Sequence, residues 1–175
     1  TRCKYALKKK ILLGFQDEKW TELLGKSQRT WIPKGQIIEI ATPGYTKRIN
    51  CFITLFWPKK KIVWDCFNRR RNIEFRRHLS HLVDYAQRNK IKKIILFIDW
   101  ATYHRTPKVK KFFREHRVLK PIFLGKKDPN MNPVEGTVNK RLASAISVNR
   151  CYSSRDELRN ATKKFLRKYN SIYAT

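Results

Sequence analysis

One apolar run, Ile94-Ile95-Leu96-Phe97-Ile98, constrains the fold of this chain more than any other segment. A strand with one face in water alternates apolar and polar residues, whereas a strand covered on both faces is apolar throughout. The run therefore predicts a central strand in a sheet that is buried on both sides.

The segments before this run predict further strands. Residues 11–15 form an apolar stretch, and residues 17–35 are polar and irregular in pattern. Residues 49–57 and 61–67 are rich in apolar and aromatic side chains, with Pro58-Lys59-Lys60 between them. Two such runs around a short turn predict a β-hairpin.

Helical patterns fill much of the rest. Residues 73–88 have apolar side chains at helical spacing, and Thr106-Pro107 predicts a second helix that ends near residue 116. Residues 121–124 predict a short strand. Asn132-Pro133-Val134-Glu135 and Ser154-Arg155-Asp156-Glu157 both match a capped helix start. This order predicts an α/β fold, a mixed central sheet flanked by helices on both faces.

The chain is strongly basic. Its 175 residues include 41 Lys and Arg against 13 Asp and Glu, a formal net charge of +28. Such a charge attracts a polyanion, above all nucleic acid, with an anionic membrane surface as the weaker alternative, and it argues against most ordinary metabolic enzymes. Hydrophobic residues make up 41% of the chain, which opposes a disordered basic tail. We expect residues 1–175 to form a single domain.

No run reaches the roughly 20 apolar residues of a membrane span, and the first residues lack a signal-peptide pattern. We therefore expect an intracellular protein without a membrane partner, in the cytoplasm or nucleoid if prokaryotic and in the nucleus if eukaryotic. The four cysteines, at 3, 51, 66 and 151, lack zinc-site spacing, which predicts free thiols. Cys51 and Cys66 flank the hairpin turn, so a disulfide between them is the alternative.

Two of the few acids follow strand-like runs. Asp17 comes after residues 11–15, and Asp99 comes directly after residues 94–98. Ligand sites in open α/β sheets collect at the carboxyl ends of strands, so the two acids are candidates for one site. Convergent carboxylates repel one another unless a cation lies between them, and Mg²⁺ or Mn²⁺ suits carboxylate oxygens. A basic surface around such acids would hold a polyanion whose phosphodiester the metals act on.

Asp17, Asp99 and a third acid, Glu135 in the capped helix start, each have a simpler interpretation as well. An Asp after a strand is often a turn or capping residue, and Glu135 is explained by helix capping alone. Asp65 also closes a strand-like run and is a rival candidate, whereas Asp128 has the context of a loop residue.

Three segments in order resemble the acidic motifs of the DDE transposases of the mariner-like superfamily, particularly its prokaryotic insertion-sequence branch. They are Phe15-Gln16-Asp17-Glu18, Phe97-Ile98-Asp99-Trp100-Ala101-Thr102-Tyr103-His104 and Asn132-Pro133-Val134-Glu135, with 35 residues between the second and third acids. Trp31-Ile32-Pro33-Lys34-Gly35-Gln36 is similar to the family's tryptophan-containing segment. The resemblance covers residues 11–170.

The resemblance implies a ribonuclease-H-like fold in which Asp17, Asp99 and Glu135 are the catalytic, metal-binding triad. It implies two Mg²⁺ ions, for which Mn²⁺ can substitute, hydrolysis of phosphodiesters at transposon ends, and joining of the 3′-OH to target DNA. The sequence departs from the family at Trp100, where Asn is usual. A homodimer in the DNA complex and a TA target are implied by the family alone. The family's N-terminal helix-turn-helix region is expected to be absent from this chain.

Further residues are candidates for binding. His104 matches a His that is frequent in the family and would contact DNA or orient the site, with a structural loop role as the alternative. The DNA-binding candidates are His104, Lys34, Lys108, Lys110, Lys111 and Arg114. Trp31 is the candidate for a contact with a second subunit. Two alternatives stay open for the whole chain: a non-enzymatic basic nucleic-acid-binding domain, such as an inactivated relative, and a ribonuclease-H-like nuclease without strand transfer.

Overall fold

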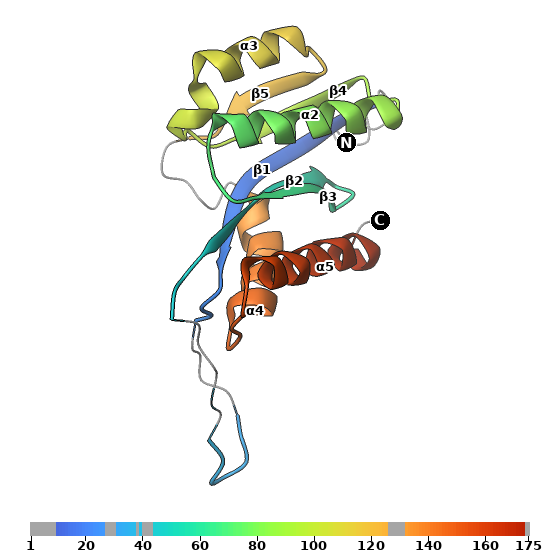
Figure 1. The fold of residues 1–175 in the computed structure, drawn as a ribbon. Helices are drawn as coiled ribbons and strands as arrows, with labels where there is room; N and C mark the ends of the chain where they lie inside the picture. Colours follow the sequence, from blue (N-terminus) through green and yellow to red (C-terminus); the bar gives the residue numbers. More distant parts are fainter. Residues whose placement is uncertain (1–9, 27–30, 38, 40–43, 126–131, 174–175) are drawn as a thin grey trace.

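The computed structural model describes residues 10–26, 31–37, 39, 44–125 and 132–173. Its strands form one mixed sheet in the order β3-β2-β1-β4-β5 (Figure 1). β1 runs antiparallel to β2 and parallel to β4, β2 and β3 form an antiparallel hairpin, and β4 and β5 are parallel. The strands are β1 (Ile11–Glu22), β2 (Arg48–Trp57), β3 (Lys61–Phe67), β4 (Lys93–Ile98) and β5 (Leu119–Phe123).

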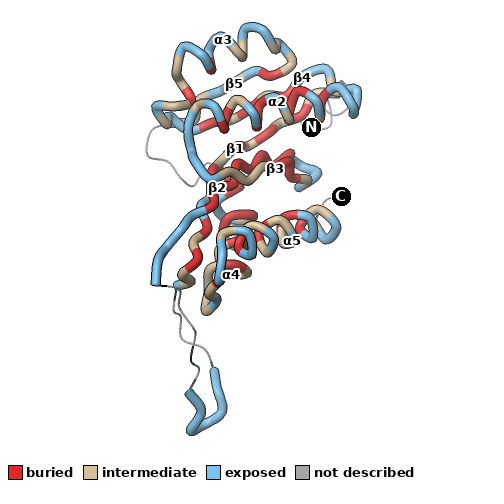
Figure 2. Tube along the Cα trace, in the orientation of Figure 1, coloured by how far each residue is buried: buried red, intermediate tan, exposed pale blue. Residues whose placement is uncertain are grey.

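Helices cover both faces of the sheet, which confirms the predicted architecture (Figure 1). One face packs against α2 (Asn72–Arg88) and α3 (Pro107–Glu115), and a 3₁₀ turn, η1 (Thr102–Arg105), leads from β4 into α3. The other face packs against α4 (Lys140–Ser147) and α5 (Arg155–Tyr173). A buried apolar cluster lies on each side of the sheet, so the strands in Figure 2 are enclosed between two helical layers.

β1 is longer than the apolar stretch predicted, and it takes in part of the segment expected to be irregular. Its ladder with β2 continues to the pair Glu22 and Arg48. Polar side chains are tolerated there because the tertiary structure gives them partners: Gln16 donates to Glu18, and the hydroxyls of Thr21 and Thr162 are 3.5 Å apart. Asp17 therefore lies within a strand rather than at its end.

Residues 94–98 form β4, which is an inner strand between β1 and β5 as predicted, although β1 and not β4 occupies the middle of the sheet. Ile94, Leu96 and Ile98 are buried against α2 and α3, whereas Ile95 and Phe97 are half-buried. α4 and α5 contact β1, β2 and β3 on the other face. The face of β4 that carries Ile95 and Phe97 is consequently less covered by helices than the opposite face.

The hairpin and the helices appear within a few residues of their predicted bounds. The predicted caps are only partly as expected: the Ser154 hydroxyl accepts from the backbone of Glu157, but the Thr106 side chain does not cap α3. The cross-strand pair Cys51 and Cys66 has 2.9 Å between sulfur atoms, and both thiols are free, as is Cys151. Cys3 lies outside the described residues.

Residues 31–37 are drawn well away from the sheet in Figure 1. All of them are exposed, including Trp31 and Lys34. Within the described residues, no helix is long and apolar enough to cross a membrane.

Candidate active site

A cleft of about 440 Å³ opens where β1, the end of β4 and the helix after residue 132 meet. Asp17, Asp99 and Glu135 all line it, so the structure brings the three predicted acids together. The strand register explains part of this, because Phe15 pairs with Phe97, and Asp17 and Asp99 each follow two residues later, Asp99 directly after the end of β4. The cleft is lined by Asp17, Glu18, Lys19, Trp20, Arg70, Asp99, Glu135, Asn139, Lys140 and Ala143.

Asp17 is largely buried and surrounded by negative charge. It lies across from Ile53 on the face covered by α4 and α5. Its Oδ2 accepts a hydrogen bond from Nδ2 of Asn139, with 2.6 Å between the atoms. Burial, together with the charges of Glu18, Glu135 and Asp99, raises the pKa of Asp17 to about 7. Burial and the neighbouring carboxylates therefore favour the neutral form of Asp17, and a bound cation would favour its ionised form.

Asp99 has one oxygen anchored by the protein. Oδ1 accepts from the backbone N–H of Ala101, at 3.0 Å, and from Nδ1 of His104, at 2.7 Å. Burial alone would raise the pKa of Asp99, but these hydrogen bonds and the His104 charge hold the pKa below its usual value. The side chain is half-exposed, so the carboxylate stays ionised at the cleft.

His104 is buried, with 1% of its surface exposed, and both ring nitrogens have partners. Nε2 lies 2.9 Å from Oε1 of Glu18, which also accepts from Gln16. Burial would lower the pKa of His104, but the hydrogen bonds from this ring to Asp99 and Glu18 raise it to about 9. The ring is therefore positively charged at neutral pH and bridges two carboxylates. This position corrects the expectation of a DNA contact and fits the alternative, an orienting role.

Glu135 begins a π-turn, η3 (Glu135–Asn139), inside one helix that spans residues 133–147. Asn132 ties the start of this helix to β1: its Oδ1 accepts from the backbone of Val134, as predicted for a cap, and its Nδ2 donates to the carbonyl of Gln16. π-Turns are frequent at functional sites. Glu135 is exposed at the cleft, which leaves its carboxylate available to a ligand.

The donor set fits a hard divalent cation. Three carboxylates line one cleft, and Asp17 and Asp99 are each held through one oxygen by Asn139 and His104. Carboxylate oxygens are the ligands that Mg²⁺ and Mn²⁺ prefer. Among the residues that the structure describes, however, no three His, Cys, Asp or Glu side chains converge tightly enough to form a metal cluster on their own.

Asp65, the rival acid, lies elsewhere. Its carboxylate accepts from His78 at 2.6 Å and from His81 at 3.1 Å, and so ties β3 to α2. Burial would raise the pKa of Asp65, but the two histidines hold it far below its usual value. This acid has a structural explanation. Asp128 lies outside the described residues.

Several residues of the cleft were not among the predicted site residues. Trp20 is 47% exposed, and its ring has the ammonium of Lys19 at 5.8 Å and the guanidinium of Arg70 at 5.9 Å. Lys140 completes the basic rim, and Asn139 lies beside Asp17. The run Arg69-Arg70-Arg71 before α2 was the available signal for Arg70; Asn139 had none, because its partner is 122 residues away.

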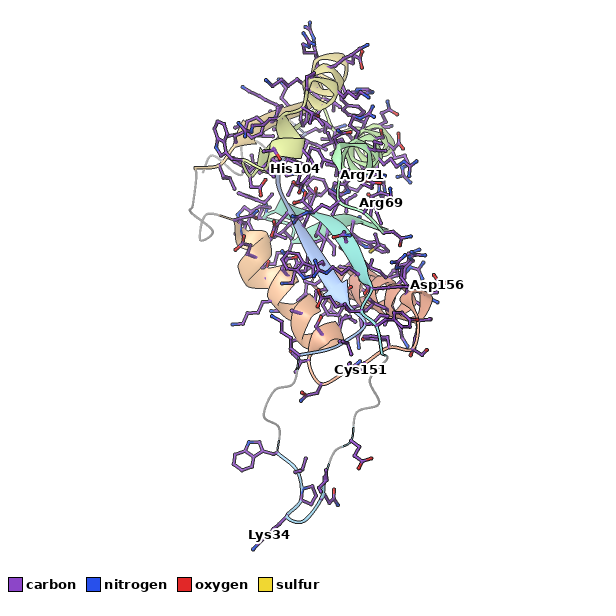
Figure 3. All side chains as sticks on the ribbon, turned by 60° about the vertical axis from the view of Figure 1, so that its left-hand side comes forward. Lys34, Arg69, Arg71, His104, Cys151 and Asp156 are labelled. Carbon is purple, nitrogen blue, oxygen red and sulfur yellow. The ribbon has the colours of Figure 1, made fainter. Side chains whose placement is uncertain are left out.

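The other predicted DNA-binding residues lie outside this cleft. Lys108, Lys110, Lys111 and Arg114 are exposed on α3, and Figure 3 shows Lys34 far from the body of the domain. None of them lines the cleft, and their binding role stays a prediction.

A mixed five-stranded sheet of this order, with helices on both faces and an acidic cleft beside its parallel strands, defines a ribonuclease-H-like domain. The family model described as "DDE superfamily endonuclease" matches residues 13–159, and the chain belongs to this family. No sequence among the curated proteins matches significantly.

Solved structures share the fold. The Mos1 transposase paired-end complex with left transposon end has a TM-score of 0.67 at 17% identity, covering 97% of this chain and 51% of that chain. The Mos1 transposase catalytic domain with raltegravir and Mg has a TM-score of 0.63 at 15% identity, covering 97% and 76%. A simian T-cell lymphotropic virus intasome has a TM-score of 0.61 at 11% identity, covering 91% and 48%. The chain thus spans about half the length of the full Mos1 chain.

Proposed function

We propose that this domain is the catalytic domain of a mariner-like DNA transposase, which hydrolyses phosphodiesters at transposon ends and joins the 3′-OH to target DNA. The observation that supports it best is the meeting of Asp17, Asp99 and Glu135 in one cleft of a DDE endonuclease domain. The similar Mos1 structures include a paired-end complex with Mn and another with Mg, and a strand transfer complex.

In this proposal Asp17, Asp99 and Glu135 hold two Mg²⁺ ions, or Mn²⁺ in their place. When bound, such ions activate water and stabilise the charge on a leaving oxygen. Two residues of the chain orient the acids: His104 contacts the carboxylate of Asp99, and Asn139 donates a hydrogen bond to that of Asp17. The rim cations Lys19, Arg70 and Lys140 would receive the phosphates on either side of the scissile bond.

The partner in this proposal is DNA, bound largely through its backbone. Trp20 offers a half-exposed ring on which an unpaired base can stack. Trp31, fully exposed on the projecting segment, is proposed to contact the second subunit of a homodimer. Lys34, on the same segment, and the exposed cations of α3 are proposed to follow the DNA backbone. The prokaryotic branch, the intracellular location and the TA target stay predictions.

A nicking assay tests the proposal. The purified chain should nick supercoiled plasmid with Mn²⁺ or Mg²⁺, and Asp99→Asn should abolish nicking while DNA binding persists. Asp84→Asn is the matched control, because Asp84 is an exposed acid on α2 outside the cleft. Undiminished nicking by Asp99→Asn would contradict the assignment of Asp99 as a catalytic residue. DNA binding without any nicking would favour a non-enzymatic module.

A joining assay separates transposition from simple hydrolysis. Precut transposon-end oligonucleotides with free 3′-OH groups should become covalently linked to plasmid in the presence of Mn²⁺. Nicking without linkage would favour the ribonuclease-H-like nuclease that lacks strand transfer.

A further inference from the structure

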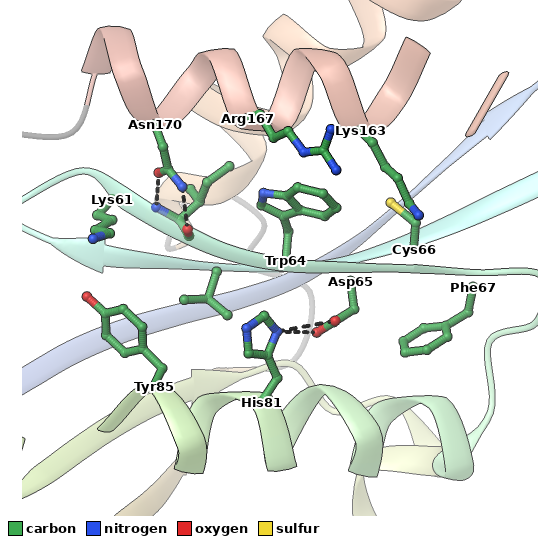
Figure 4. Close-up of a pocket in the computed structure, with 12 residues that line it drawn as sticks. Lys61, Trp64, Asp65, Cys66, Phe67, His81, Tyr85, Lys163, Arg167 and Asn170 are labelled. Carbon is green, nitrogen blue, oxygen red and sulfur yellow. Dashed lines mark hydrogen bonds and ion pairs between the residues drawn. The ribbon is translucent and has the colours of Figure 1, made fainter. Parts of the chain in front are cut away.

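The sheet has an open edge on the side opposite β5. β3 is the last strand in the sheet order, and a cavity of about 500 Å³ runs along its outer edge. α5 borders this cavity on one side and α2 on the other (Figure 4). The cavity shares no lining residue with the acidic cleft, so it is a separate feature.

The side chain of Asn170 already forms hydrogen bonds with backbone groups at this edge. Its Oδ1 accepts from the backbone N–H of Ile62 at 2.8 Å, and its Nδ2 donates to the carbonyl of Ile62 at 2.9 Å (Figure 4). The backbone groups of Ile62 therefore point away from β2. Because these directions alternate along an antiparallel strand, Trp64 and Cys66 point their backbone groups the same way. In the described chain, no hydrogen bond from outside the sheet reaches them.

An edge of this kind accepts another extended chain. Unpaired N–H and C=O groups in a row are a template for strand addition, and side chains in flanking pockets then supply specificity. A DNA backbone has phosphate acceptors but no donors to match the C=O groups. The edge therefore favours a peptide over DNA, despite the positive charge of the protein.

The two walls of the cavity differ in chemistry. Lys163 and Arg167 extend over it from α5, whereas Tyr85 and the ring of Phe67 line it on the α2 side (Figure 4). The one acid of the cavity, Asp65, is already paired with His78 and His81. A strand added to β3 would direct alternate side chains to the two walls. Acidic side chains complement the α5 wall, and apolar ones complement the α2 wall.

We propose that the outer edge of β3 binds an extended segment of a partner protein in which acidic and apolar residues alternate. The segment adds a strand through the backbone groups of Trp64 and Cys66 and places its acids against Lys163 and Arg167. This inference does not depend on the proposed transposase activity.

The probe is a blocked peptide, acetyl-Glu-Val-Glu-Val-Glu-Val-amide, titrated into the chain by calorimetry. We expect binding that weakens at least tenfold in the double variant Lys163→Glu with Arg167→Glu. The control is Lys164→Glu with Lys168→Glu, which reverses two exposed charges on the same helix outside the cavity. A second peptide, N-methylated at alternate residues on the N–H groups that face β3, should also bind at least tenfold more weakly. Circular dichroism checks that each variant is folded.

Three outcomes overturn the proposal. The first is that the peptide does not bind at all. The second is general electrostatic attraction, seen as equal binding of a Glu-Glu-Glu-Val-Val-Val peptide or equal loss in the control variant. The third is that the Lys163 and Arg167 reversal abolishes binding of a short DNA duplex but leaves peptide binding intact, which makes the edge a DNA surface.

Discussion

Asn139 donates a hydrogen bond from Nδ2 to Oδ2 of Asp17, with 2.6 Å between the atoms, although 122 residues separate them in the chain. The bond holds one oxygen of Asp17 in place. Asp99 is held in the same way, through its Oδ1, by His104. Two acids of the cleft thus have their orientation set by neighbours that carry no negative charge.

Replacing Asn139 should weaken metal binding. Asn139→Leu keeps a similar volume in this buried position but removes the donor to Asp17. Loss of a group that orients a metal ligand typically costs about 10-fold to 100-fold in metal affinity. Electron paramagnetic resonance titration of Mn²⁺ measures this loss, with Ser144→Leu, an exposed site on α4, as the control. Unchanged Mn²⁺ affinity in Asn139→Leu would show that the contact is only structural.

His104 should make stability depend on pH. Its pKa is about 9 in the folded protein against 6.5 for an ordinary histidine. Because the folded-state pKa is raised, this stabilisation is complete below about pH 6.5 and is lost as the pH rises through about 9. The shift corresponds to about 3 kcal/mol. Urea unfolding at pH 6, 7.5 and 9 should show this decline, and His104→Gln should flatten it; an equal decline in the variant contradicts the assignment.

Asp17→Asn should stabilise the protein while removing activity. Because the folded-state pKa is raised from 3.8 to about 7, the ionised Asp17 opposes folding above its unfolded pKa, and the penalty is complete above about pH 7. The shift corresponds to up to about 4 kcal/mol. Thermal unfolding at pH 8 should therefore show a higher midpoint for Asp17→Asn, with the difference disappearing toward pH 4. A lower midpoint at pH 8 would contradict this prediction.

Asp65→Asn should lower stability rather than activity. The carboxylate pairs with His78, which is completely buried, and with His81. The variant removes the charged acceptor of these hydrogen bonds, at a cost of about 2 kcal/mol. Because the pKa of Asp65 is lowered, this stabilisation is present near neutral pH and is lost in acid, as the pH falls below the ordinary Asp value. Urea unfolding measures the loss; Asp156→Asn, which changes an exposed acid paired with Arg159, is the control and should change the midpoint much less.

Arg70→Ala should weaken DNA binding. The logarithm of the binding constant falls linearly with the logarithm of the salt concentration, and each phosphate contact that is lost reduces the magnitude of this slope by about 1. Fluorescence anisotropy with a single-stranded oligonucleotide across a salt series measures both effects. Arg88→Ala, an exposed arginine at the end of α2, controls for the loss of one charge. An equal change in both variants would remove Arg70 from the binding site.

Local patterns predicted the elements that depend on neighbouring residues. The hairpin of β2 and β3 and the helix α2 follow from alternation and from helical spacing, which are visible in short windows. The second half of β1 was missed because its polar residues find partners far along the chain, as Thr21 does with Thr162. The apolar run of β4 predicted cover on both faces, but Ile95 and Phe97 are only half-buried, because such a run does not reveal which helices pack against each face.

The sequence by itself determined the order of the three acids, the positive charge around them and the α/β alternation. Only the tertiary structure decided that the parallel register of β1 and β4 brings Asp17 and Asp99 to the same cleft. It also decided that His104 is buried between Asp99 and Glu18 rather than facing DNA, and that Asp65 pairs with histidines. The physical reason is that register and burial arise from pairings between distant segments, whereas charge and periodicity are properties of each segment alone.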